Sequence, residues 1–314
     1  MSSSLLYANL IMVSQNNIYN YNYIYYYQQC VNAEVYFCKT NIDSALYYYQ
    51  RAFSSVDYSL TKDIYNATIC SALLQKDSLM FEWIQICVSR GYPLSNFRRN
   101  TVVFSSYFID DKWSQLELWE DSIRNNCYLK INTNYRLTLK LLDNRDIEIR
   151  HKIKEWNFWF PKSKNTKKKF AQLSEIDSLN RLIIDSLIFL YGYPCEQNIG
   201  LATGSLLSWF PISIYHYRDS LFIFKTLFNA MLQGKLSPRD YATKVDDLSF
   251  VEKKESIYYT FYNPAAIPCE EKIIINQRRI AIGLPTLEDE EMMRNYYRAT
   301  HNQYGIYLYI PFFK

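Results

Sequence analysis

The clearest pattern along the chain is a set of small and aromatic residues that recurs at a fixed interval within amphipathic helical segments. A shift of 34 residues aligns five pairs: Ala33 with Ala67, Tyr36 with Cys70, Ala45 with Leu79, Tyr49 with Trp83, and Ala52 with Ile86. Small residues let two helices approach closely, and an aromatic residue fills the groove between them. The pattern therefore predicts two consecutive helical hairpins.

Turn and helix-ending residues agree with the two predicted hairpins. Asn41 and Asp43 lie between the first two predicted helices, and Asp77 and Ser78 lie between the third and the fourth. Gly91 and Pro93 follow the fourth helix. A further shift of 34 retains mainly large residues, at Thr101, Phe104, Trp113 and Trp119. We interpret residues 94–125 as a helical capping segment. An ordinary antiparallel bundle has the same apolar periodicity, but the shared register favours a repeat.

The segments DSALYYYQRAF and DIYNATICSALL carry a family resemblance. Together with the 34-residue register, residues 26–92 resemble tetratricopeptide-like repeat proteins of bacteria. The resemblance implies a protein or peptide partner. Because two units cannot bury their own faces, we expect them to pack on the rest of the chain.

Helical spacing continues in the second half. One predicted helix begins at a capping box of Ser174 and Asp177 and ends at Gly192 and Pro194. Further helices are expected from Pro211 to Gly234, from an N-cap at Ser237, and from Thr286. β-branched and aromatic runs at 257–262 and 273–275 indicate a small β-hairpin, and 306–310 could add a strand. The predicted fold class is therefore mainly α with a minor β-hairpin.

The chain divides into four predicted parts. Residues 1–25 are an N-terminal segment, and residues 26–125 hold the tetratricopeptide-like repeats. Residues 126–170 are a connecting helix followed by a lysine-rich loop, in which five lysines fall within PKSKNTKKK at 161–169. Residues 171–314 form a mainly helical domain of unknown function.

A second set of residues carries a resemblance over about residues 135–300. They are Asp146 and Arg150, Gly192 and Pro194, Gly200, His216, Asp246 or Asp247, Asn276, Arg278, Arg279, Gly283 and Leu284. In this order they resemble an uncharacterised bacterial family, a domain of unknown function from Bacteroides-like lineages. The chain departs from that pattern at several polar positions, among them Ile147 and Tyr193.

Composition narrows the function classes. With 314 residues, 49% of them hydrophobic and 21% charged, the chain has a globular composition. The net charge of +4 gives no general case for nucleic acid, and the lysine run is more typical of a solvated loop. We assign no binding role to the tyrosines of 19–27. Seven dispersed cysteines show no zinc spacing, and cofactor motifs are absent, so we expect neither a metal nor a cofactor.

The first residues contain a short apolar stretch at 5–13 (LLYANLIMV). No Lys or Arg precedes it and no clear cleavage site follows, so we expect a cytoplasmic protein. Export to the periplasm, with residues 1–14 as a signal segment, is the alternative. Nothing in the sequence reaches the length of a membrane span.

Two groups of polar residues are candidate catalytic or binding groups. His216 has Asp219 on the same face of its predicted helix, and would act as a general base or a metal ligand if it is not simply a core histidine. Asp246 and Asp247 lie near the end of a predicted helix, where the helix dipole disfavours negative charge. Arg278 and Arg279 are their expected partners, most simply in a structural clamp. Arg150 is a further candidate for ligand binding, with Arg278.

Two functions from different classes remain open. The favoured one is a non-catalytic scaffold that binds a protein or peptide. The alternative is a hydrolase-like or small-ligand-binding enzyme that uses His216 with Asp246 or Asp247 and with Arg278 or Arg279. The enzyme requires these side chains to converge in an open cleft.

Overall fold

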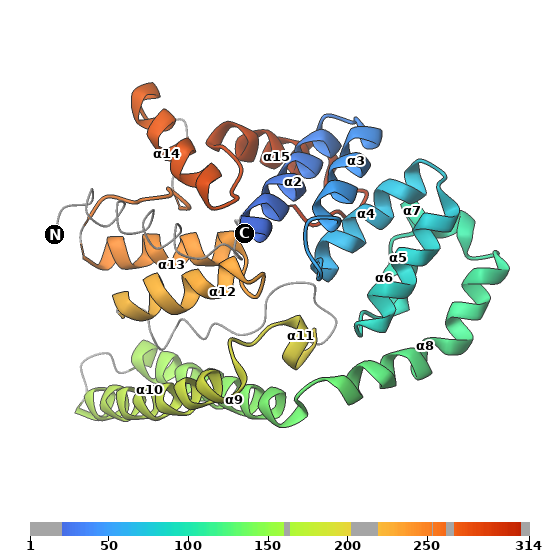
Figure 1. Cartoon of the computed structure of the whole chain (residues 1–314). Helices are drawn as coiled ribbons and strands as arrows, with labels where there is room; N and C mark the ends of the chain where they lie inside the picture. The colour runs from blue at the N-terminus through green and yellow to red at the C-terminus, as the bar shows by residue number, and fades with distance from the viewer. Residues whose placement is uncertain (1–20, 160–163, 202–218, 253, 262–266, 309–314) are drawn as a thin grey trace.

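The computed structural model describes residues 21–159, 164–201, 219–252, 254–261 and 267–308, and these ranges are mainly helical (Figure 1). In chain order the elements are α2 (Tyr21–Cys38), α3 (Ile42–Phe53), α4 (Thr61–Leu73), α5 (Asp77–Ser89), α6 (Leu94–Arg99), α7 (Thr101–Phe104), the 3-10 turn η1 (Ser105–Tyr107), α8 (Asp111–Lys130), α9 (Thr133–Trp159), α10 (Lys164–Tyr191), α11 (Glu196–Ile199), the π-helical turn η3 (Phe222–Leu227), α12 (Phe228–Leu232), α13 (Pro238–Val251), α14 (Cys269–Ala281) and α15 (Leu287–Thr300).

The first four helices pack in successive pairs, α2 against α3 and α4 against α5, and α3 also contacts α4. The small and aromatic residues that defined the 34-residue register lie at these contacts. Those that are fully buried are Ala33, Ala45, Tyr49, Ala52, Ala67 and Cys70. The predicted turn also holds, because the side chain of Asn41 caps α3 by accepting a hydrogen bond from the N–H of Ser44 at 3.1 Å.

The next segment, α6 to α8, packs on these helices. α8 packs against α5 and α6 and buries Trp113 completely. Trp119, which the register placed at a packing position, is 57% exposed. The shift of 34 residues therefore matches buried positions at Phe104 and Trp113 and departs from the packing at Trp119.

The predicted β-hairpin is wrong in the part of the chain that the structure describes, where no strand occurs. The isoleucines of 273–275 belong to α14. This helix has Glu270 and Glu271 in its first turn and Arg278 and Arg279 in its last, which matches the helix dipole, and it buries Ile275. The helix-favouring charges and this burial outweigh the β propensity of three isoleucines.

Helices α9 and α10 form a long hairpin along one edge of the molecule (Figure 1). α10 begins at Lys164, so the lysine run is partly helical and Ser174 is not its N-cap. The predicted end is confirmed, because α10 stops at Tyr191 before Gly192. Leu179, Leu182 and Leu190 of this helix are exposed, whereas Asn180 and Ile184 are completely buried.

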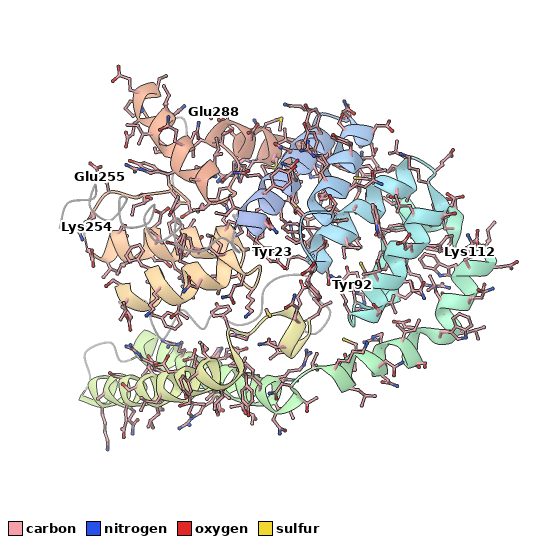
Figure 2. The ribbon with its side chains drawn as sticks, viewed as in Figure 1. Tyr23, Tyr92, Lys112, Lys254, Glu255 and Glu288 are labelled. Atoms are coloured by element: carbon pink, nitrogen blue, oxygen red, sulfur yellow. The ribbon has the colours of Figure 1, made fainter. Side chains whose placement is uncertain are left out.

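Both halves of the chain share one hydrophobic core, whose buried residues run from Tyr26 to Leu308. α2 contacts α12 and α15 as well as α3. Figure 2 shows Tyr23 at the start of α2, next to the turn that follows α12. In that turn Gly234 has a φ of +70°, and a Cβ atom there would lie 2.1 Å from Cε1 of Tyr23. Only glycine lets the turn and this ring pack together.

Two predicted helix starts in the second half are confirmed. Ser237 caps α13 by accepting a hydrogen bond from the N–H of Asp240 at 3.0 Å, and Pro238 follows as the first helical residue. Thr286 caps α15 in the same way through the N–H of Asp289 at 3.0 Å. Among the described residues, no helix combines the length and the apolar character that crossing a membrane requires.

Candidate functional site

The candidate base His216 lies outside the described residues, whereas its expected partner Asp219 lies within them. The carboxylate of Asp219 accepts a hydrogen bond from the N–H of Phe222 at 2.9 Å and so caps the turn η3. It also pairs with Arg181 of α10. Asp219 therefore joins η3 to α10, and this role accounts for an acidic residue at that position.

Asp246, the second candidate, is a buried acceptor that organises a loop. One carboxylate oxygen accepts hydrogen bonds from the N–H groups of Ile257 and Tyr258, at 2.8 and 2.9 Å. The other accepts the N–H and the hydroxyl of Thr260, both at 2.8 Å. These four donors compensate the unfavourable position of Asp246 near the end of α13. The carboxylate is thus fully engaged within the protein.

Arg279 is completely buried, but its ion-pair partner is not the one that the sequence indicated. Its guanidinium pairs with Glu290 of α15 and donates to the carbonyl oxygens of Tyr258 and Pro285, at 2.8 and 2.7 Å. The expected clamp between Asp246 and Arg279 is therefore indirect and passes through Tyr258. Burial lowers the pKa of Arg279, which Glu290 partly offsets.

Glu290 is the centre of this network. It pairs with Arg239 of α13 and Arg294 of α15 in addition to Arg279. Burial alone would raise the pKa of Glu290, but the three arginines outweigh burial and lower it. Three cations on one buried carboxylate tie α13, α14 and α15 together.

The remaining candidates are not gathered with these groups. Asp247 forms an ion pair with Lys244 one turn earlier on α13, at 2.9 Å. Arg278 is half-buried on α14, next to Arg279 in sequence. Arg150 bonds Asp146 at 2.7 Å and Asp177 of α10 at 2.9 Å, and so joins α9 to α10. Among the described residues, no group of His, Cys, Asp or Glu side chains is suited to a metal ion.

A different surface brings polar side chains to a stretch of main chain. We call it the inner face, and it is formed by Glu34 and Phe37 of α2, Lys62, Tyr65 and Asn66 of α4, and Asn100 between α6 and α7. We call residues 302–308, which follow α15, the strap. In Figure 1 the strap is the red segment that runs from α15 among the blue helices.

The side chain of Asn66 bonds both main-chain groups of one strap residue, as the backbone of a neighbouring β-strand would. Its amide nitrogen donates to the carbonyl oxygen of Tyr307 at 2.8 Å, and its amide oxygen accepts the N–H of the same residue at 2.8 Å. Lys62 donates to the same carbonyl at 3.3 Å. One hairpin further on, Asn100 donates to the carbonyl oxygen of Tyr304 at 2.7 Å. The inner face therefore binds main-chain atoms of the strap at two residues, Tyr307 and Tyr304.

Aromatic contacts accompany the hydrogen bonds at both residues. The ring of Tyr307 packs edge-on against Tyr65, with centroids 5.4 Å apart. The ring of Tyr304 packs edge-on against Phe37 at 5.9 Å. Ile306 and Leu308 of the strap are buried. The strap is thus bound through its backbone and through aromatic and apolar side chains.

A lysine and two carboxylates lie beneath the strap. Lys62 contacts Glu34 at 2.9 Å and Asp63 at 3.0 Å, and both carboxylates are fully buried. Burial by itself lowers the pKa of Lys62, but the attraction of Asp63 and Glu34 outweighs it and raises the pKa above the usual value. Lys62 therefore stays protonated, as a donor to the strap requires.

The sequence carried a signal for the inner face that the packing pattern concealed. Asn32, Asn66 and Asn100 are spaced by 34 residues, and each stands directly before the small residue of its unit. Asn32 and Asn66 lie inside helices, where asparagine is unfavourable, and Asn100 is the N-cap of α7. The recurrence of asparagine is the sequence signal that accompanies the contacts of Asn66 and Asn100 with the strap.

Comparison of the chain with protein-family models, with curated proteins and with solved structures gave no significant match.

Proposed function

We propose that the chain is a non-catalytic scaffold that binds an extended peptide segment of a partner protein on its inner face. The observation that carries the proposal is the pair of hydrogen bonds between the side chain of Asn66 and both main-chain groups of Tyr307. Such bonds read the backbone of an extended chain and not its sequence. They would serve a partner peptide equally well.

The 34-residue register supports the same proposal. If the paired helices are tetratricopeptide-like units, equivalent residues of successive units lie on one continuous surface. Asn66 and Asn100 are equivalent residues, and both contact the strap. Asn32 is the third member of the series, on α2. A row of asparagines at helix-to-helix spacing is suited to a ligand that crosses the helices.

The enzyme alternative receives less support from the described residues. Asp246 accepts four hydrogen bonds from its own loop, and Arg279 is enclosed with Glu290. A catalytic group must reach a substrate. Both side chains are instead committed to holding α13, α14 and α15 together.

Selection of peptides on the immobilised chain tests the proposal. A random peptide library should yield binders that contain aromatic residues, and Asn66→Ala should weaken their binding at least about tenfold, since it removes two hydrogen bonds to the main chain. Asn126→Ala is the matched control, because Asn126 is exposed on α8. The proposal fails if no peptide is selected, or if the selected peptides bind the Asn66→Ala variant as well as they bind the control.

A further inference from the structure

The strap has the features of a ligand and not only of a connection between elements. The hydrogen bonds that fix it to the helices come from the side chains of Lys62, Asn66 and Asn100. It leaves α15 through two residues in the left-handed region, His301 and Asn302, with φ of 48° and 51°. A bound peptide could make the same contacts.

The two main-chain contacts of the strap, at Tyr304 and Tyr307, lie three positions apart. An extended chain rises about 3.3 Å per residue, so three residues span at most about 10 Å. The strap stays within this limit, because Gly305 between the two contacts lies in the left-handed region at a φ of +65°. The distance between packed helices is about 8–10 Å. A peptide that follows the path of the strap therefore meets one asparagine for every three of its residues.

Side-chain contacts define what such a peptide must carry. Tyr304 and Tyr307 place aromatic rings against Phe37 and Tyr65. Between them Gly305 has a φ of +65°, and a Cβ atom there would lie 3.0 Å from Nδ2 of Asn100. The inner face thus favours two aromatic residues three positions apart, with glycine directly after the first.

We propose that the strap is an intramolecular ligand that closes the inner face, and that the partner is an extended peptide with aromatic residues three positions apart which displaces it. This inference rests on the function proposed above and adds the chemistry of the partner and the regulation of its binding. A tethered segment competes at an effective concentration that reaches the millimolar range. The affinity of the intact chain for a peptide is reduced in proportion to the fraction of molecules in which the strap is released.

The test uses the full chain and a fluorescent peptide with the strap sequence NQYGIYL, followed by fluorescence anisotropy. Two variants loosen the strap and leave the inner face unchanged: Tyr307→Ala removes one ring, and Gly305→Ala introduces a Cβ atom beside Asn100. Both should bind the peptide about tenfold or more tightly than the unaltered chain does. Adding Asn66→Ala to either variant should abolish that gain. Tyr191→Ala is the control, because Tyr191 is a half-exposed tyrosine of α10.

The outcomes separate this inference from the proposed function. Equal affinity of the unaltered and loosened chains, with binding lost in Asn66→Ala, would retain the peptide site and reject closure by the strap. No binding to any variant, with circular dichroism and melting temperature unchanged, would reject the peptide site itself. If both loosened variants lose their helical circular dichroism, the strap is a structural element of the core and the inference is wrong.

Discussion

Single buried charges hold the second half of the protein together, and their positions follow from simple electrostatics. Near the C-terminal end of a helix, the helix dipole disfavours a negative charge. An acidic residue at that position therefore needs hydrogen-bond donors from another part of the protein. Asp246 finds four of them, in a loop more than ten residues away. The conflict was visible in the sequence, but the partners were not, because the donors are backbone groups of residues whose types carry no signal.

Replacing Asp246 should therefore cost much more stability than replacing its neighbour. Asp246→Ala leaves three buried N–H groups and a hydroxyl without an acceptor, and we expect the free energy of unfolding to fall by about 2–4 kcal/mol. Asp247→Ala removes only a partly exposed pair with Lys244, and should change it by less than about 1 kcal/mol. Urea denaturation followed by circular dichroism measures both. Equal losses would contradict the assigned role of Asp246.

At the scale of elements, the sequence predicts helix boundaries where local capping and helix-ending residues mark them. Gly192 and the N-caps Ser237 and Thr286 are local signals, and the structure confirms them. The start of α10 was misplaced by ten residues, since the lysine run was interpreted as a loop although lysine is a good helix former. The β propensity of the α14 isoleucines predicts a strand, because this propensity does not include the effect of tertiary packing.

The α9–α10 hairpin should be a local unit whose ion pairs matter little to global stability. Arg150 bridges Asp146 and Asp177, but its side chain is 38% exposed, so solvent screens the interaction. Arg150→Ala should lower the free energy of unfolding by about 1 kcal/mol or less. Hydrogen–deuterium exchange should nevertheless become faster at 146–150 and 174–178. Arg145→Ala, at an exposed position on the same helix, should leave exchange unchanged. Slower exchange in Arg150→Ala would contradict this account.

At the scale of the whole molecule, one core joins segments from both halves, as expected for helical hairpins that cannot bury their own faces alone. Tyrosines 23, 26 and 27, to which we had assigned no binding role, pack with one another at this junction. Their concentration in one segment is explained by packing, because α2 is enclosed by α3, α12 and α15. Contacts between residues so distant in sequence cannot be inferred from local periodicity.

The junction predicts a difference between two glycines. Gly234→Ala would place a methyl group into the ring of Tyr23 and should lower the melting temperature of the whole chain in one transition. Gly192→Ala imposes comparable backbone strain, at a φ of +77°, but its nearest neighbour is Nζ of Lys235 at 3.7 Å. We expect Gly234→Ala to lose at least about 1–3 kcal/mol more than Gly192→Ala. Calorimetry that found the two variants equally stable would argue against this junction.

Acid should weaken the molecule through Glu290. Because the folded-state pKa of Glu290 lies below the usual value of a glutamate, about 4.5, its contribution is present above that pH and is lost as the pH falls through the folded-state pKa. Glu290→Gln should cost about 3–5 kcal/mol at pH 7, since it removes the carboxylate that pairs with the buried Arg279 and with the partly exposed Arg239 and Arg294. The difference from the unaltered chain should shrink below about pH 4.5.

Glu291→Gln is the control for this prediction, because Glu291 is exposed on the same helix. Thermal melts between pH 3 and pH 7 should show no comparable change for it. Burial raises the pKa of Glu196, which gives stability of the opposite pH dependence, so only the difference between the variants isolates Glu290. A Glu290→Gln difference that stays constant with pH would contradict the assignment.

The strap also has a consequence for synthesis on the ribosome. Asn66 and Tyr307, which bond directly, are separated by 241 residues. At about 5–20 residues per second, the first two hairpins emerge roughly 12–50 s before the segment that covers their inner face. During that interval Phe37 and Tyr65 lack their strap partners. During synthesis the nascent chain therefore exposes the inner face to chaperones, and to the peptides proposed above as partners, before the strap can cover it.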